Sequence, residues 1–142
     1  MLYSKILLLA TAFTVVQITT LLAQSVQTGG ETDGCSNPQT QTEMNICASE
    51  ALRAADGDLN ADYKMARDEM RRIDSDLPKN MRGAAKALLN GQRAWIKYRD
   101  GACNAEGFVF RGGSIEPLIV STCKERLTRQ RSEDLRKLFE RN

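Results

Sequence analysis

A stripe of apolar side chains at helical spacing constrains the fold more than any other feature. Over residues 44–73, apolar positions recur at steps of three and four. That period places them along one face of an α-helix, whereas a β-strand would require alternation. Thr40 followed by Glu43 is typical of a capping box, so we predict a helix over residues 40–74. Glycine at position 57 lowers the stability of a helix by about 1 kcal/mol relative to alanine. The predicted helix could therefore be kinked or interrupted at this residue.

Two further helical patterns follow along the chain. Pro78 suits the first turn of a second helix over residues 78–104, and Pro117 suits the first turn of a third over 115–140. Aromatic residues make up 6% of the chain, which favours helices over a β-sandwich. Three helices joined by short turns predict an all-α fold, a small antiparallel three-helix bundle that forms one domain.

The cysteine content predicts two disulfides. The even number of four cysteines in a chain with an export signal implies bridges. Four cysteines allow three pairings, and the local pairing is favoured because each bond then closes a short loop around a predicted helix end. The favoured bonds are Cys35–Cys47 and Cys103–Cys123. Such bonds contribute about 3 kcal/mol each in the chain-entropy model.

The N-terminal segment is typical of a secretory signal. Lys5 is followed by residues 6–23, which carry no charge and supply an apolar core. We therefore predict a signal peptide over residues 1–23, a flexible polar leader over 24–34 and the helical domain over 35–142. The alternative is a retained membrane anchor, because the apolar run approaches the ~20 residues that span a bilayer.

Charge is distributed unevenly between the two halves of the chain. Residues 31–76 hold 11 acidic and 5 basic side chains, and residues 77–142 hold 7 acidic and 14 basic side chains. Either the halves pack together and neutralise each other, or one exposed patch meets a partner of opposite charge. Acidic residues are interleaved among the basic ones of the last helix, which argues against a nucleic-acid partner.

The segment 92–100 gathers the most distinctive polar side chains. At helical spacing Gln92, Trp95 and Arg99 share one face, and we interpret the sole tryptophan as a core anchor. A buried polar group without a partner costs about 1–3 kcal/mol, so the glutamine and arginine require partners. The helix predicted over residues 40–74 offers three candidate partners, namely Asp56, Asn60 and Tyr63. We interpret the set as a structural polar network, with an active site as the alternative.

A glycine-rich loop is predicted over residues 105–114. Phe108 and Phe110 lie among its glycines, followed by Arg111. One interpretation is that the two phenylalanines fold back over the bundle as a plug. The alternative is an exposed hydrophobic tip, which makes these three residues the candidate partner-binding residues.

The composition argues against common catalytic and metal chemistry. The chain has no histidine, so no imidazole can activate a cysteine or complete a typical zinc site. It also has no nucleophile motif and no phosphate-binding loop. We therefore predict a protein that is not an enzyme and that has no cofactor and no metal site.

These residues together resemble a known family. The pattern is Cys35…Gln41-x-Glu43-Met44-Asn45-x-Cys47-Ala48, Ala55-Asp56-x-x-Leu59-Asn60-x-x-Tyr63 and Gln92-Arg93-Ala94-Trp95-Ile96-x-Tyr98-Arg99-Asp100-x-x-Cys103, continued by Gly112-Gly113-Ser114, Cys123, Thr128 and Arg131. It resembles the domain of unknown function 1311, also called the lysozyme inhibitor LprI-like N-terminal domain. The likeness covers about residues 35–138.

The resemblance implies a small, secreted, disulfide-bonded helical domain of bacterial envelopes. The family is named after a lipoprotein that inhibits lysozyme. This chain lacks a lipid-attachment cysteine directly after its signal, which implies a soluble protein rather than an anchored one. The resemblance transfers no catalytic or inhibitory residues to this sequence.

We therefore expect a periplasmic or secreted binding protein whose partner is a protein, a lysozyme-type muramidase. The acidic stretch of helix one would steer toward a cationic enzyme, and Arg111 would enter the enzyme's acidic cleft. The alternative is a non-enzymatic structural or adaptor module of the envelope that binds a protein or peptidoglycan. We expect no nucleic-acid partner and no membrane association after signal cleavage.

Overall fold

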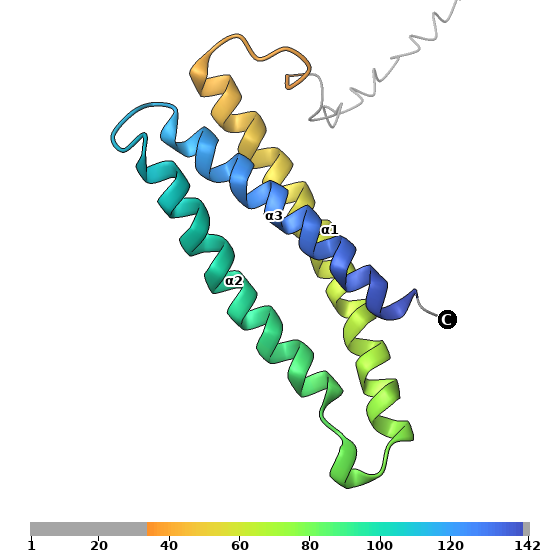
Figure 1. The fold of residues 1–142 in the computed structure, drawn as a ribbon. Helices are drawn as coiled ribbons and strands as arrows, with labels where there is room; N and C mark the ends of the chain where they lie inside the picture. Colours follow the sequence, from red (N-terminus) through yellow and green to blue (C-terminus); the bar gives the residue numbers. More distant parts are fainter. Residues whose placement is uncertain (1–33, 141–142) are drawn as a thin grey trace, which may run out of the picture.

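The computed structural model describes residues 34–140, which form three α-helices and one short 3-10 helix. The helices are α1 (Gln41–Asp76), α2 (Ala84–Phe108) and α3 (Glu116–Phe139), and the 3-10 helix is η1 (Lys79–Met81). Figure 1 shows that α3 lies along α1, whereas α2 runs beside the pair as the third member of the bundle. No strand occurs in the described part of the chain, which confirms the all-α prediction.

The first helix begins where its capping residues predict. The Glu43 amide donates to Thr40 Oγ1 at 3.2 Å, and the Thr40 amide donates to Glu43 Oε2 at 3.0 Å. The Gln39 amide, at 2.7 Å, is the main reason that the pKa of Glu43 is lowered. The helix runs unbroken through Gly57, because Ala55 and Leu59 on either side are buried and packing outweighs a low helix propensity.

The second helix begins six residues later than the sequence predicts. Pro78 lies in front of η1, and α2 starts at Ala84, after Gly83 with φ 155°. Asp74 causes this shift, since its carboxylate accepts the backbone amides of residues 83–85 at 2.8, 2.9 and 3.1 Å. These three bonds satisfy donors that a helix start leaves open, and they lower the pKa of Asp74.

The core is narrow and rests on small side chains along α1. Ala55, Leu59 and Ala66 are buried there, and Leu88 of α2 and Leu135 of α3 close over them. Partly buried residues surround this cluster, namely Tyr63, Met70, Trp95, Leu138 and Phe139. Trp95, which we interpreted as a core anchor, is partly buried and packs against the edge of the core.

Polar residues form much of the seam between α1 and α3. Ser132 is buried and its hydroxyl donates to Asp62 Oδ2 at 2.6 Å. Arg136 donates to the same oxygen at 3.0 Å, which raises the pKa of the arginine. The two helices are thus fixed in register by hydrogen bonds as well as by packing.

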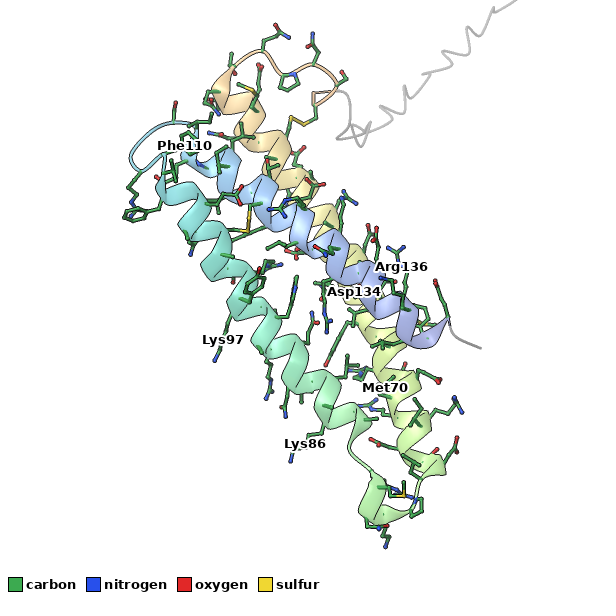
Figure 2. The ribbon with its side chains drawn as sticks, in the orientation of Figure 1. Met70, Lys86, Lys97, Phe110, Asp134 and Arg136 are labelled. Carbon is green, nitrogen blue, oxygen red and sulfur yellow. A yellow bond between two sulfur atoms is a disulfide. The ribbon has the colours of Figure 1, made fainter. Side chains whose placement is uncertain are left out.

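Both disulfides have the predicted local pairing. Cys35–Cys47 fastens the segment before α1 to its second turn, and Cys103–Cys123 joins α2 to α3, each with a Cα–Cα distance of 5.5 Å. The sulfur–sulfur bonds lie in the same half of the molecule (Figure 2). The opposite end, where α1 meets η1 and α2, carries none of these bonds and is two helices thick, because α3 ends short of it (Figure 1).

The predicted signal peptide over residues 1–23 and most of the leader over 24–34 lie outside the described residues. Between residues 34 and 140, no helix is long and apolar enough to cross a membrane.

Candidate functional site

Two regions of the structure are candidate binding sites, and the first is a cleft between α1 and α2. It has a volume of about 400 Å³, which is in the range of sites for small ligands. Four lining residues come from α1 and five from α2, each set at helical spacing. They are Asp56, Leu59, Asn60, Tyr63, Leu89, Gln92, Arg93, Ile96 and Arg99. We call this region the α1–α2 cleft.

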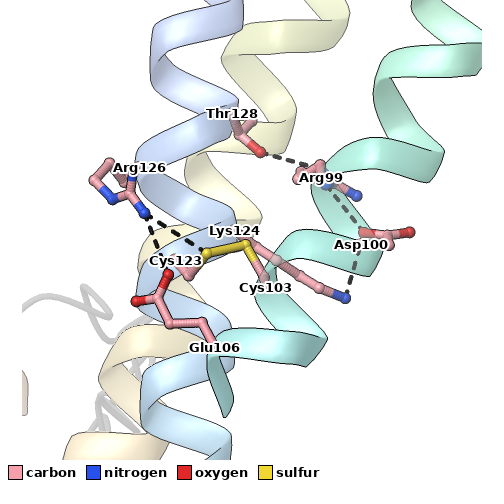
Figure 3. The surroundings of a disulfide bond; sticks show 8 residues. All are labelled: Arg99, Asp100, Cys103, Glu106, Cys123, Lys124, Arg126 and Thr128. Carbon is pink, nitrogen blue, oxygen red and sulfur yellow. Dashed lines mark hydrogen bonds and ion pairs between the residues drawn. A yellow bond between two sulfur atoms is a disulfide. The ribbon is translucent and has the colours of Figure 1, made fainter. Parts of the chain in front are cut away.

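Arg99 is held at the inner end of the α1–α2 cleft by all three helices. Its Nη1 donates to Asp56 Oδ1 at 2.8 Å and to Thr128 Oγ1 at 3.0 Å. Its Nε donates to Asp100 at 3.1 Å, and its guanidinium lies 5.2 Å from the centre of the Trp95 ring. With its side chain only 13% exposed, Arg99 acts as a structural cross-link (Figure 3).

Gln92 has its partner on a different helix from the one predicted. The side chain is 8% exposed, and Oε1 accepts a hydrogen bond from Arg131 Nε of α3 at 3.0 Å. The sequence pointed to helix one, because it gives no information on which side chain of the third helix lies opposite. Among the described residues the amide nitrogen of Gln92 has no partner, so it remains available to the cleft.

Asn60 and Tyr63 line the α1–α2 cleft but do not join the hydrogen-bonded network. Within residues 34–140 neither side chain makes a hydrogen bond, and Arg93 makes neither a hydrogen bond nor an ion pair. Of the predicted network, the structure therefore connects Asp56 to Arg99 and leaves Asn60 and Tyr63 free. The sequence prediction did not include Arg93 among the site residues, although it lies three positions before Ile96, at helical spacing.

The second region is the turn between α2 and α3, residues 108–115, which we call the tip. The predicted loop began at residue 105, but α2 continues to Phe108. Phe108, Val109 and Phe110 are 64%, 80% and 41% exposed, so the expectation of a plug over the bundle is wrong. The turn lies beside the first turns of α1, where Asn45 Nδ2 donates to the Ser114 carbonyl at 3.0 Å, and its three apolar side chains remain exposed there. Phe110 is labelled at this end of the bundle in Figure 2.

The backbone of the tip is well ordered by hydrogen bonds. The amide of Phe110 donates to the Gly107 carbonyl at 2.9 Å, and that of Gly113 donates to the Phe110 carbonyl at 2.9 Å. Gly112 adopts φ 79°, a conformation that favours glycine, and its amide donates to Glu116 Oε2 at 2.9 Å. The tip is therefore a defined protrusion that loses little conformational freedom on binding.

Arg111 supplies a positive charge at the tip. Its Nη1 lies 2.9 Å from Glu116 Oε1, and its guanidinium lies 5.4 Å from the centre of the Phe108 ring. The Gly112 amide first and Arg111 second lower the pKa of Glu116. The Arg111 side chain is 68% exposed, so its ion pair is weak and can be exchanged for another carboxylate.

The disulfide Cys103–Cys123 supports the base of the tip. Ion pairs between α2 and α3 lie beside it, from Lys124 to Asp100 at 3.4 Å and from Arg126 to Glu106 at 3.5 Å (Figure 3). Gly107 lies so close to Val120 that a Cβ there would collide with the valine side chain. This close approach brings the two helices together directly below the tip.

The uneven charges of the two chain halves pair in part across the helices. Asp56–Arg99 joins α1 to α2 at 2.8 Å, Asp62–Arg136 joins α1 to α3 at 3.0 Å, and Arg129 lies 3.8 Å from Asp58. The expectation that the halves neutralise each other is therefore met along the α1–α3 seam. In the described part of the chain, no three His, Cys, Asp or Glu side chains gather as a metal site would require.

A further hollow, of about 600 Å³, lies beside Cys35–Cys47 on α1. Its two charged groups, Glu50 and Arg53, lie 3.8 Å apart as an ion pair. The hollow thus presents mainly an apolar surface, and the α1–α2 cleft offers more specific chemistry.

The family model described as lysozyme inhibitor LprI matches residues 33–135, which is most of the chain. The chain belongs to the LprI family. An uncharacterized protein of Rhizobium meliloti (strain 1021) is 44% identical over 109 residues, covering 75% of this chain and 78% of the relative.

The LprI fold also has a solved counterpart. The crystal structure of a DUF1311 family protein from Pseudomonas putida KT2440 matches with a TM-score of 0.63 at 22% identity, covering 75% of this chain and all of that one. At that identity the likeness shows the fold, which agrees with the helical bundle described above.

Part of the pattern quoted in the sequence analysis lines the α1–α2 cleft. Eight of its nine lining residues belong to the pattern quoted in the sequence analysis, and Leu89 is the exception. The three candidate partner-binding residues at the tip, Phe108, Phe110 and Arg111, lie outside that pattern. The turn glycines Gly112 and Gly113 and the adjacent Ser114 do belong to the pattern, so the tip shares its backbone with the pattern but not its exposed side chains.

Proposed function

We propose that this protein acts outside the cytoplasm as a non-catalytic binding protein, and that it inhibits a lysozyme-type muramidase through the tip. Membership of the LprI family supports the activity. Two disulfides support the compartment, because such bonds persist in oxidising environments such as the periplasm. The predicted signal over residues 1–23 is consistent with export to the periplasm or secretion.

The observation that carries this proposal is the exposed apolar surface of the tip. Phe108 and Phe110 flank Val109 on a backbone that hydrogen bonds hold in one shape. Burying one such side chain contributes about 1.5–3 kcal/mol to association. A rigid aromatic protrusion of this kind is typical of the anchor that one protein inserts into the cleft of another.

The charge of the tip suits a glycosidase cleft. Glycoside hydrolysis commonly uses a pair of carboxyl groups that flank the scissile bond, which makes the cleft acidic. Arg111 would exchange its exposed pair with Glu116 for a carboxylate of the enzyme. The acidic surface of α1 would add steering toward a cationic enzyme, which affects the association rate more than the final affinity.

The test is a cell-wall lysis assay with lysozyme and increasing amounts of the purified, oxidised protein. We expect the parent protein to slow lysis, and Phe108→Ser to weaken inhibition at least tenfold, corresponding to about 1.4 kcal/mol. Met65→Ser is the matched control, because Met65 is 54% exposed on α1, away from the tip. Unchanged lysis at a large molar excess of the parent protein would contradict the proposal and favour the adaptor role.

A further inference from the structure

We propose that the α1–α2 cleft binds a small ligand with an acylated peptide backbone that ends in a free carboxylate. This site is separate from the tip, and the inference does not depend on lysozyme inhibition. It rests on the size of the cleft, on the polar groups left without partners there and on its balance of charge.

The unpaired groups define what the ligand must offer. Arg93 has no ion-pair partner among the described residues, and Asn60 and Tyr63 have no hydrogen-bond partner there. The amide nitrogen of Gln92 is likewise free, because only its oxygen is engaged, by Arg131. A guanidinium together with amide and hydroxyl groups matches a carboxylate and a neighbouring peptide unit.

The charges of the lining residues favour a ligand with a single negative charge. Asp56 is the one carboxylate in the lining, and its nearest cation, Arg99, neutralises it at 2.8 Å. Arg99 also serves Asp100 and Thr128, so it has little left to offer a ligand. Arg93 alone therefore remains uncompensated, which suits a carboxylate better than a dianionic phosphate.

The apolar lining and the volume of the cleft limit the size and polarity of the rest of the ligand. Leu59, Leu89 and Ile96 provide an apolar wall beside these polar groups. A cavity of about 400 Å³ accommodates an acylated dipeptide with small side chains, and it is too small for a folded domain. The peptide ends of bacterial cell walls and the C-termini of proteins share this chemistry, and they differ in the chirality of their residues.

The experiment is an NMR titration of the purified, oxidised protein with N-acetyl-Ala-Ala in its L,L and D,D forms. The side-chain amide signals of Asn60 and Gln92 report directly on the α1–α2 cleft. We expect one form to shift both signals saturably and its C-terminal amide to bind at least tenfold more weakly. Preference for the D,D form identifies cell-wall peptides as the source, and preference for the L,L form identifies protein termini.

Arg93→Gln should weaken binding of the carboxylate at least tenfold while leaving the spectrum otherwise unchanged. Lys97→Gln makes the same change of charge on the same helix, and its side chain points away from the bundle (Figure 2), so it should bind like the parent. Both variants should retain inhibition in the lysis assay. Equal binding of acid and amide, shifts confined to residues outside the cleft, or no shifts at millimolar peptide would overturn the proposal.

Discussion

The tip and the α1–α2 cleft share helix α2, which pairs with a different helix in each. At the tip, α2 and α3 are clamped together by Cys103–Cys123, and the apolar side chains face solvent. In the cleft, α2 stands beside α1 without a disulfide, and hydrogen-bonding groups such as Arg93 have no partner within residues 34–140. A rigid apolar protrusion suits the concave surface of a protein, whereas a small polar hollow suits a small molecule. The two surfaces of this short bundle therefore suit different classes of partner.

The largest expected effect comes from removing the clamp of the tip. Replacing Cys103 and Cys123 together by alanine should cost about 3 kcal/mol of unfolding free energy, measured by urea denaturation, because the bond closes a loop with a sequence separation of 20. It should also weaken inhibition of lysozyme. The matched double replacement of Cys35 and Cys47 should leave inhibition unchanged. If both double variants inhibit lysozyme equally well, the Cys103–Cys123 bond does not support the tip in the way described.

The next effect separates the two arginines of the cleft. Arg99→Met should lower the unfolding free energy by about 2 kcal/mol, because it leaves buried Thr128 and the Asp56 carboxylate without their donor. Arg93→Met should change it by less than about 0.5 kcal/mol, since Arg93 is exposed and has no ion-pair partner in the described part of the chain. Thermal and urea unfolding of both variants checks this. A comparable loss for Arg93→Met would show that it is structural rather than available to a ligand.

A smaller effect concerns the close approach below the tip. Gly107→Ala should destabilise by about 1–2 kcal/mol, because the added methyl group collides with Val120. Gly101→Ala on the same helix meets nothing within 4 Å and should stabilise by about 0.5–1 kcal/mol. Urea midpoints of the two variants give the comparison directly. Stabilisation by both would mean that α2 and α3 are farther apart than described.

The smallest effect is expected on acidification and compares the two ends of the bundle. The pKa values of Asp74 and Glu116 are lowered by backbone amides, so both carboxylates stabilise the fold above their unfolded pKa values, near 4. That contribution is lost as the pH falls through the lower folded values. Asp74→Asn and Glu116→Gln should each flatten the loss of stability below pH 4, measured by urea unfolding from pH 2.5 to 7. Asp68→Asn, whose carboxylate accepts no backbone amide, is the control and should keep the parent slope.

Local chemistry made much of the fold predictable from the sequence. The apolar stripe and the capping box around Thr40 fixed α1, and the loop lengths favoured the disulfide pairing that is observed. The start of α2 could not be predicted in the same way, because Asp74 reaches amides nine to eleven residues further along the chain. A pattern of hydrophobic residues cannot predict such hydrogen bonds between a side chain and distant backbone amides.

The cleft and the tip were predicted less completely than the fold. Helical spacing brought Gln92 and Arg99 to one face, but the partner of Gln92 on α3, Arg131, depends on how the helices are rotated against each other. Phe108 was expected in a loop, whereas the structure places it at the last position of α2 with its side chain exposed. Sequence gives the face of a helix, whereas the tertiary arrangement decides which faces remain uncovered.

The placement of both disulfides in one half of the molecule has a mechanical consequence. At the far end, α1 and α2 are joined by the segment 77–83 and by the bonds of Asp74, with no third helix over them. Fluctuations that separate α1 from α2 there break few contacts, so backbone amides at this end should exchange hydrogen sooner than those near the sulfur bonds. The end of the bundle that lies away from the disulfides should therefore open more readily than the end that carries the tip.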